Sequence, residues 1–143
     1  MRIENDEGLT IADGDRKGTD LQERCFDFAC RIIGLIDEIS SKGATDRGLA
    51  SQLLRSGTSI GANVEEADAA QSRADFVSKL TIALKEARES YYWLRLLKRT
   101  GKMPHNEDAE SLLVEANRLV AILTSIVRNT KDNTPPKEGS ARV

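Results

Sequence analysis

The sequence predicts an all-α fold, namely an antiparallel up-down-up-down four-helix bundle. Three observations predict it. Proline is scarce, because the 143 residues hold three prolines, two of them the adjacent Pro135 and Pro136 near the C-terminus. Apolar residues recur at spacings of three and four in four separate segments, which is the period of an amphipathic helix. Short polar segments join these four, as in a bundle of antiparallel neighbours. With 4% aromatic residues, aliphatic side chains must form most of the core.

The first helix is expected to begin at Thr19 or Asp20, because Asp20 followed by Glu23 resembles a capping box. It is expected to end before Gly43, a residue suited to a left-handed position after a helix. We expect residues 1–19, which are polar, to form a disordered or loosely attached arm, or a leader segment. The predicted core residues share the helical spacing and are Phe26, Ala29, Ile32, Ile33, Ile36 and Ile39.

The second helix is expected over residues 45–68 and has an unusually small packing face. Gly57 and Gly61 lie beside its apolar stripe, and a glycine costs a helix interior about 1 kcal/mol relative to alanine. Such residues are tolerated best where a neighbouring backbone comes close, so another helix should approach tightly here. The stripe consists of Leu49, Leu53, Gly57, Ile60, Val64 and Ala67.

The third helix is expected from Ser72, with Asp75 three residues later, to Arg99, before Gly101 and Pro104. Its apolar residues span a sector of roughly 220°, about twice what an ordinary amphipathic helix needs. Part of this sector can face the core, and the remainder predicts a cover from a second subunit. The residues expected to make that subunit contact are Ile82, Trp93 and Leu97.

The fourth helix is expected from Asn106 to Thr130, with acidic residues in its first turn. Residues 20–130 would therefore form the bundle, and residues 131–143 a disordered tail. Its predicted core stripe consists of Leu112, Leu113, Ala116, Leu119, Val120, Leu123, Ile126 and Val127.

Charge is unevenly distributed along the chain. The net charge of −2 argues against a generally basic nucleic-acid-binding protein, yet residues 72–100 carry seven lysines and arginines against three acidic residues. Three interpretations remain open for this basic side of the third helix: a solvated flank, pairing with acids of a neighbouring subunit, or contact with the phosphates of RNA or DNA. The candidate nucleic-acid-binding residues are Lys85, Arg88, Arg95, Arg99 and Lys102.

The outer face of the second helix is a further candidate for contact between subunits. Arg55 and Glu66 carry charge there, and Ser59 is a small polar residue between them. Small residues between charges are typical of a contact surface, and a ring or two-fold interface could use this face.

The sequence lacks the residues from which a catalytic or metal site would be built. His105 is the single histidine and falls in the turn between the third and fourth helices, and no Glu-x-x-His occurs. Cys25 and Cys30 lie five residues apart on one helix, too poorly placed to bridge each other. We therefore expect no enzyme activity, no metal and no cofactor. Without a membrane-spanning or signal-like apolar run, we expect a cytoplasmic protein.

The stretch QLLRSGTSIGANVEEADAAQSRADFVSKLTIALKEARESYYWLRLL resembles the 23S ribosomal RNA intervening-sequence proteins, and the resemblance covers roughly residues 21–130. Matching positions include Ser59 to Asn63, Glu65 to Ala67 and Trp93-Leu94. The resemblance implies a four-helix bundle that assembles into a ring-shaped homopentamer. A distant relative, the accessory variability determinant of diversity-generating retroelements, is a basic pentamer that associates with a reverse transcriptase and nucleic acid, whereas this chain is near neutral.

Two functions follow from these observations. The first is a non-enzymatic, homo-oligomeric accessory or scaffold protein that associates with nucleic acid, or with a nucleic-acid-processing protein, through the basic flank of the third helix. The alternative is a structural protein–protein interaction module without nucleic-acid binding, which the near-neutral charge and the wide apolar sector favour.

Overall fold

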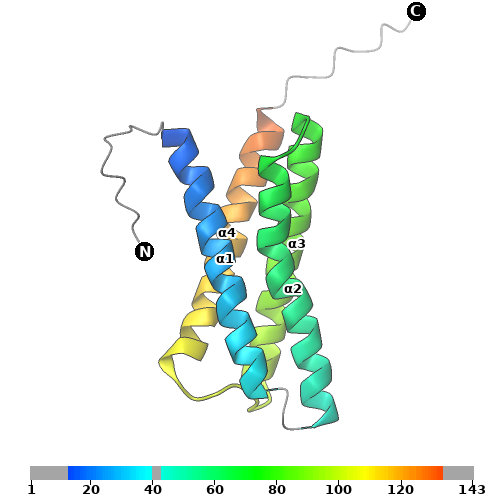
Figure 1. Ribbon diagram of the computed structural model, residues 1–143, viewed down its shortest axis with the longest axis vertical. Coiled ribbons are helices and arrows are strands. Elements are labelled where there is room, and N and C mark those ends of the chain that lie inside the picture. Colours follow the sequence, from blue (N-terminus) through cyan, green and yellow to red (C-terminus); the bar gives the residue numbers. More distant parts are fainter. Residues whose placement is uncertain (1–12, 40–42, 134–143) are drawn as a thin grey trace, which may run out of the picture.

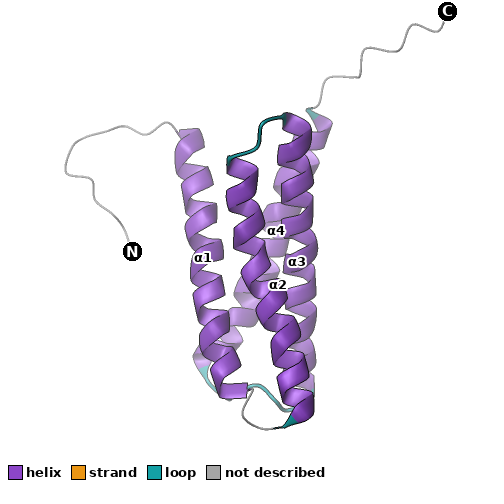
Figure 2. Cartoon of the chain, turned by 45° about the vertical axis from the view of Figure 1, so that its right-hand side comes forward, coloured by secondary structure: helices purple, strands orange, loops and turns teal. Residues whose placement is uncertain are grey.

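The computed structural model describes residues 13–39 and 43–133, which form four long helices that run alternately up and down (Figure 1). They are α1 (Asp13–Ile39), α2 (Ala44–Asp68), α3 (Arg73–Arg99) and α4 (Glu107–Asp132). Within the described ranges no strand occurs. Each helix packs against its neighbour in sequence, and α4 returns to lie beside α1, so the beginning of α1 and the end of α4 lie at one end of the bundle. The predicted all-α four-helix bundle is confirmed, and Figure 2 shows the short connection between α2 and α3.

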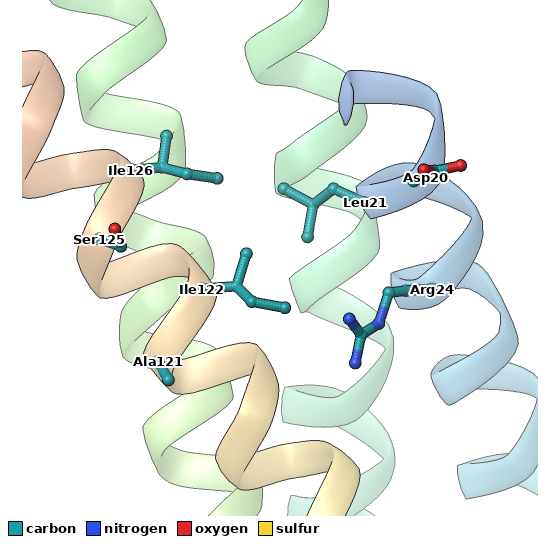
Figure 3. A pocket seen from close by; sticks show the side chains of 7 residues that line it. All are labelled: Asp20, Leu21, Arg24, Ala121, Ile122, Ser125 and Ile126. Atoms are coloured by element: carbon teal, nitrogen blue, oxygen red, sulfur yellow. The ribbon is translucent and has the colours of Figure 1, made fainter. Parts of the chain in front are cut away.

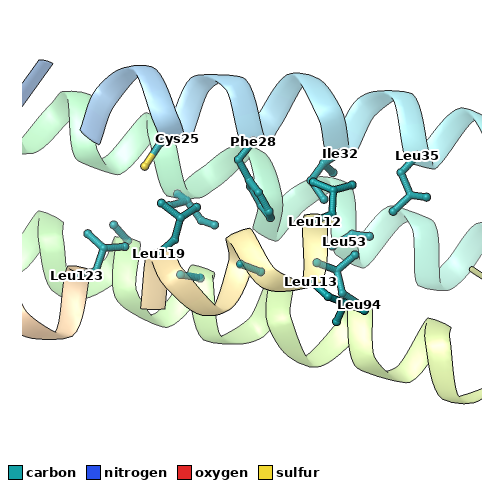
Figure 4. Packing of buried hydrophobic residues seen from close by; sticks show 14 of the residues in the cluster. Cys25, Phe28, Ile32, Leu35, Leu53, Leu94, Leu112, Leu113, Leu119 and Leu123 are labelled. Atoms are coloured by element: carbon teal, nitrogen blue, oxygen red, sulfur yellow. The ribbon is translucent and has the colours of Figure 1, made fainter. Parts of the chain in front are cut away.

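The core runs the length of the bundle and is mainly aliphatic. Phe28 is the one aromatic residue among the largest fully buried side chains of the described residues, and its ring points into a cluster of aliphatic side chains (Figure 4). Complete burial of one such side chain contributes roughly 1.5–3 kcal/mol. The fully buried large aliphatic residues are Ile32, Ile39, Leu53, Ile60, Leu94, Leu97, Leu112, Leu119 and Leu123.

The structure corrects two expectations for the first helix. α1 begins at Asp13, upstream of the expected start at Thr19 or Asp20. Phe26 and Ile33, expected in the core, are 63% and 48% exposed. The helix instead buries a face on which apolar residues alternate at spacings of four and three, the seam pattern of packed helices. That face consists of Leu21, Cys25, Phe28, Ile32, Leu35 and Ile39.

The small packing face of α2 is confirmed. A Cβ atom on Gly57 would lie 3.0 Å from Cγ1 and 3.1 Å from Cγ2 of Ile32, and one on Gly61 would lie 3.3 Å from Cβ of Cys25. The two glycines therefore let α1 approach α2 more closely than any side chain would allow. Gly43 differs from expectation, because it lies in an extended conformation directly before α2 instead of a left-handed one after α1.

The ends of α3 and α4 follow from their sequences. The Ser72 hydroxyl accepts a hydrogen bond from the Asp75 amide at 3.1 Å, and the Asn106 side chain accepts one from the Ala109 amide at 2.8 Å. These caps satisfy amides that a helix start leaves unpaired. After α3, Gly101 has φ of 71°, and its amide donates to the Lys98 carbonyl at 3.1 Å, a left-handed helix stop.

The proposed terminal segments lie mostly outside the described residues. Residues 1–12 of the expected arm and 134–143 of the expected tail are not part of the described ranges. α4 continues to Asp132, two residues past its expected end at Thr130. The domain boundaries at residues 20 and 130 therefore stay predictions.

Candidate functional site

Four of the exposed cations of α3 lie on one side of the helix and form what we call the basic flank, which consists of Lys85, Arg88, Arg95 and Arg99. These residues span 14 positions, a rise of roughly 21 Å along the helix axis. Within residues 13–39 and 43–133, none of the four forms an ion pair with a carboxylate. The Arg95 guanidinium lies 4.8 Å from the centroid of the Tyr91 ring, a cation–π contact that orients the side chain and leaves its charge in place.

Two acidic residues of α3, Glu86 and Glu89, form their ion pairs with α2 and not with the basic flank. The Arg55 guanidinium of α2 pairs with Glu86 at 3.1 Å and also with Glu89, and the Trp93 indole donates to Glu89 at 3.2 Å. The hydrogen bond from Arg55 is the main reason why the pKa of Glu89 lies below its ordinary value. α3 therefore presents acids to α2 and bases to its outer side.

Lys102 does not belong to the basic flank, although the sequence suggested that it would. It follows the left-handed Gly101 in the turn after α3, and its ammonium pairs with Asp46 in the first turn of α2. Asp46 is buried, so its charge needs a partner. The Lys102 side chain thus ties the α3–α4 turn to the start of α2.

A groove of about 460 Å³ between α3 and α4 adjoins the basic flank. Arg95 and Tyr91 line it from α3, and Asn117 and Arg118 line it from α4. Arg118 is exposed and adds a cation to the same side of the bundle. The sequence-based analysis missed Arg118, because only the packing of α4 beside α3 brings it to this groove.

Of the three α3 residues expected to contact another subunit, Leu97 was assigned wrongly. It is 0% exposed and belongs to the core. Trp93 is half-buried and packs on that core, and Ile82 is 38% exposed. The physical reason is that α3 packs against both α2 and α4, so two neighbours of the same chain cover most of its wide apolar sector.

The three α2 residues expected at a subunit contact differ in whether their polar groups already have a partner within the chain. The Arg55 guanidinium forms ion pairs with Glu86 and Glu89, as described above. The Ser59 hydroxyl donates to the Arg55 carbonyl at 2.6 Å, within its own helix. Glu66 is exposed. Only Glu66 therefore offers a charge that is not already used by the described part of the chain.

The outer face of α1 is the apolar surface that sequence reasoning missed. Phe26 and Ile33 are exposed there, with the exposed thiol of Cys30 between them. Arg24 and Arg31 of α1 are held away from this face, because Arg24 pairs with Glu115 at 2.7 Å and Arg31 with Asp108 at 3.1 Å, both on α4. Between residues 20 and 39, the charged side chains that remain on the outer face are acidic.

A second groove, of about 510 Å³, opens between α1 and α4 near the end where α1 begins and α4 ends. Leu21 of α1 faces Ile122 and Ile126 of α4 across it, and Arg24 lies at its side (Figure 3). Its lining is mostly apolar.

Groups with potential for catalysis are few in the described ranges. His105 is exposed in the α3–α4 turn. Burial raises the pKa of the Cys25 thiol to about 12, which makes it a poor nucleophile. No group of three or more His, Cys, Asp or Glu side chains that could hold a metal ion occurs within residues 13–39 and 43–133. None of the helices in that part of the chain combines the length and apolarity that a membrane crossing needs.

Comparison with known proteins gives a matching family model and similar solved structures, of which one is described here. The family model described as 23S rRNA-intervening sequence protein matches residues 17–125. A crystal structure of a protein with unknown function, from the S23 ribosomal protein family of Bacteroides thetaiotaomicron VPI-5482, is similar with 43% sequence identity and a TM-score of 0.70. The similarity covers 78% of this chain and 98% of that one. No curated protein matches this chain.

Proposed function

This chain belongs to the 23S rRNA-intervening sequence protein family, and from that premise we propose that it is a non-enzymatic, homo-oligomeric accessory protein that associates with nucleic acid through the basic flank of α3. The observation that carries the nucleic-acid part is the set of four exposed cations without a carboxylate partner in the described chain. Contacts to phosphates depend on positive charge and on long side chains, and they do not require the geometry by which a protein recognises particular bases. Such a flank therefore suits a nucleic-acid backbone.

The salt dependence of binding tests this part of the proposal. Titrations with single-stranded RNA and duplex DNA at several salt concentrations should give affinities that fall with salt, because phosphate contacts release counterions. Four contacts predict a log–log slope of roughly −3 for a single strand and about −3.5 for a duplex. An affinity that does not change with salt, or no binding at low salt, would contradict the proposal.

A matched pair of variants locates the binding surface. Arg88→Ala with Arg95→Ala should weaken binding and reduce the magnitude of the slope by about one to two units, since two phosphate contacts are removed. Arg47→Ala, which changes an exposed arginine of α2 outside the basic flank, is the control and should leave the slope unchanged. Equal losses in both variants would mean that binding depends on overall charge instead of the basic flank.

The homo-oligomeric part of the proposal is supported by the exposed apolar residues of α1, because large side chains such as Phe26 are seldom left in water when a partner can cover them. The family resemblance suggests five subunits, and the lack of a signal-like or membrane-spanning apolar run suggests a cytoplasmic location. Size-exclusion chromatography with light scattering measures the subunit number directly. A monomer at micromolar concentration would refute self-association.

The same exposed residues of α1 favour a second candidate function, a protein–protein interaction module that binds no nucleic acid. Under this alternative, the titrations described above show no salt-dependent binding while the chain still self-associates. The two measurements together therefore separate the two functions.

A further inference from the structure

The outer face of α1 carries what we call the acidic stripe, which consists of Glu23, Phe26, Cys30, Ile33 and Asp37. At about 100° per residue these side chains fall within a sector of roughly 80°. Phe26, Cys30 and Ile33 are exposed, and so are the two acids at the ends of the stripe. Neither Glu23 nor Asp37 has an ion-pair partner in the described chain.

The acidic stripe and the basic flank have the same length and repeat. In the acidic stripe, the terminal acids lie seven residues on either side of Cys30. In the basic flank, Lys85 and Arg99 lie seven residues on either side of Tyr92, which is 49% exposed. Each therefore spans 14 positions, or roughly 21 Å of helix. The intervening positions also complement each other, because two large apolar side chains in the stripe correspond to two arginines whose alkyl stems can cover apolar surface.

We propose that the acidic stripe of one copy packs against the basic flank of a second copy, so that copies associate head to tail. This inference rests on the self-association included in the proposed function and names its two surfaces. Because the two surfaces differ, the contact is heterologous, and repetition of it gives a ring if the rotation closes. A two-fold contact of α1 with α1 of another copy would instead set Glu23 against Asp37, and like charges oppose that arrangement.

The arrangement has a consequence for the nucleic-acid interface. A basic flank covered by a neighbouring copy cannot contact phosphate. The two ligands of the flank, the acidic stripe of another copy and a nucleic-acid backbone, therefore compete, and each is weakened by salt. A closed ring covers every basic flank, so nucleic acid would bind dissociated copies, and an excess of nucleic acid would disperse the assembly.

Charge reversal tests the proposed contact in the full chain. One variant carries Glu23→Lys and Asp37→Lys, and the other carries Lys85→Glu and Arg99→Glu. All four positions are exposed, and unchanged far-ultraviolet circular dichroism would establish that both variants fold. Light scattering should find each variant alone to be monomeric, whereas an equimolar mixture should regain association, because the reversed surface of one variant is complementary to the reversed surface of the other.

A control and a contrary outcome make this test specific. Glu66→Lys, on the outer face of α2, should assemble like the unmodified chain. If the Lys85→Glu and Arg99→Glu variant assembles normally, or if the mixture stays monomeric, the head-to-tail contact is wrong. A monomeric unmodified chain would overturn both this contact and the self-association on which it rests.

Cross-linking tests the register. Cys30 and Tyr92 are the centres of the two surfaces, so they meet whether the helices run parallel or antiparallel. Tyr92→Cys should therefore form disulfide-linked multimers with Cys30 of other copies under mild oxidation, while the buried Cys25 stays unreactive. Ala62→Cys, on an exposed position of α2, is the control and should give no ladder of multimers. Equal cross-linking of the two variants would contradict the proposed register.

Competition separates this inference from the proposed nucleic-acid function. The Glu23→Lys and Asp37→Lys variant keeps an open basic flank, so it should bind single-stranded oligothymidylate at least several-fold more tightly than the unmodified chain. The same oligonucleotide should reduce the mass of the unmodified assembly. If the variant is monomeric yet binds no oligonucleotide, the nucleic-acid proposal fails and the subunit contact stands. If binding occurs and the mass of the assembly does not change, competition is refuted.

Discussion

The close approach of α1 and α2 at Gly57 makes a sharp prediction for Gly57→Ala. A Cβ atom added at this position would lie 3.0 and 3.1 Å from two γ carbons of Ile32, which is fully buried and cannot move aside freely. Overpacking of this kind costs about 1–3 kcal/mol. Replacement of glycine by alanine inside a helix also contributes roughly 1 kcal/mol of stabilisation. The free energy of unfolding should therefore fall by about 0–2 kcal/mol.

Gly48→Ala is the matched control in the same helix. Gly48 is exposed, and a Cβ atom added there would have no neighbour within 4 Å. This variant should gain the helix contribution of roughly 1 kcal/mol without the packing cost. Subtraction of the two changes removes the helix contribution and leaves the cost of overpacking, about 1–3 kcal/mol.

Urea denaturation followed by circular dichroism measures both variants. Protein concentration must be equal throughout, because self-association adds to the apparent stability. If Gly57→Ala stabilises the chain as much as Gly48→Ala does, then α1 does not approach α2 closely at this point, and the reasoning about the small packing face is wrong.

Three further predictions concern stability and reactivity. Ser56→Ala should lower the free energy of unfolding by about 1–3 kcal/mol, because it removes the hydroxyl that accepts a hydrogen bond from the buried Ser90 hydroxyl at 2.9 Å. Urea denaturation should show a smaller loss for the variant with both serines changed to alanine, because no unpaired hydroxyl is left. The pKa of Glu89 is depressed in the folded protein, so the Glu89 carboxylate stabilises the fold above its ordinary pKa, and this stabilisation is lost as pH falls through the lower folded value. The free energy of unfolding, measured as a function of pH on the acid side, should show that Arg55→Ala removes this contribution. In the Glu23→Lys and Asp37→Lys variant, which is expected to be monomeric, an aromatic disulfide reagent should modify one thiol per folded chain, Cys30, and two after unfolding in denaturant; two reactive thiols in the folded variant would contradict the burial of Cys25.

The packing face predicted for α2 was confirmed, and the one predicted for α1 was wrong. The face of α2 was predictable because glycines inside a helix, here Gly57 and Gly61, indicate that a neighbouring helix packs closely at those positions. On α1, by contrast, two apolar faces compete, one containing Phe26 and Ile33 and the other Leu21, Cys25 and Phe28. The second has the regular four–three spacing along the whole helix, and that regularity was the signal that sequence reasoning passed over.

The candidate interface was predictable only in part. Helical periodicity alone places Lys85, Arg88, Arg95 and Arg99 on one side of α3. The loss of Lys102 from this group depends on the left-handed turn at Gly101 and on a buried acid 56 positions earlier in the chain. Such a partner cannot be identified from the local sequence, because it is brought close only by the return of the chain.

The sequence by itself determined four helices, the caps of α3 and α4, the stop of α3, and the side of each helix that carries charge, because those properties depend on residues within a few turns of one another. The tertiary structure decided which apolar residues are left for a partner. The apolar sector of α3 is covered by α2 and α4, while Phe26 and Ile33 of α1 remain exposed. Burial depends on how many neighbours surround a helix and on which side they lie, and this is a property of the packed bundle instead of any single segment.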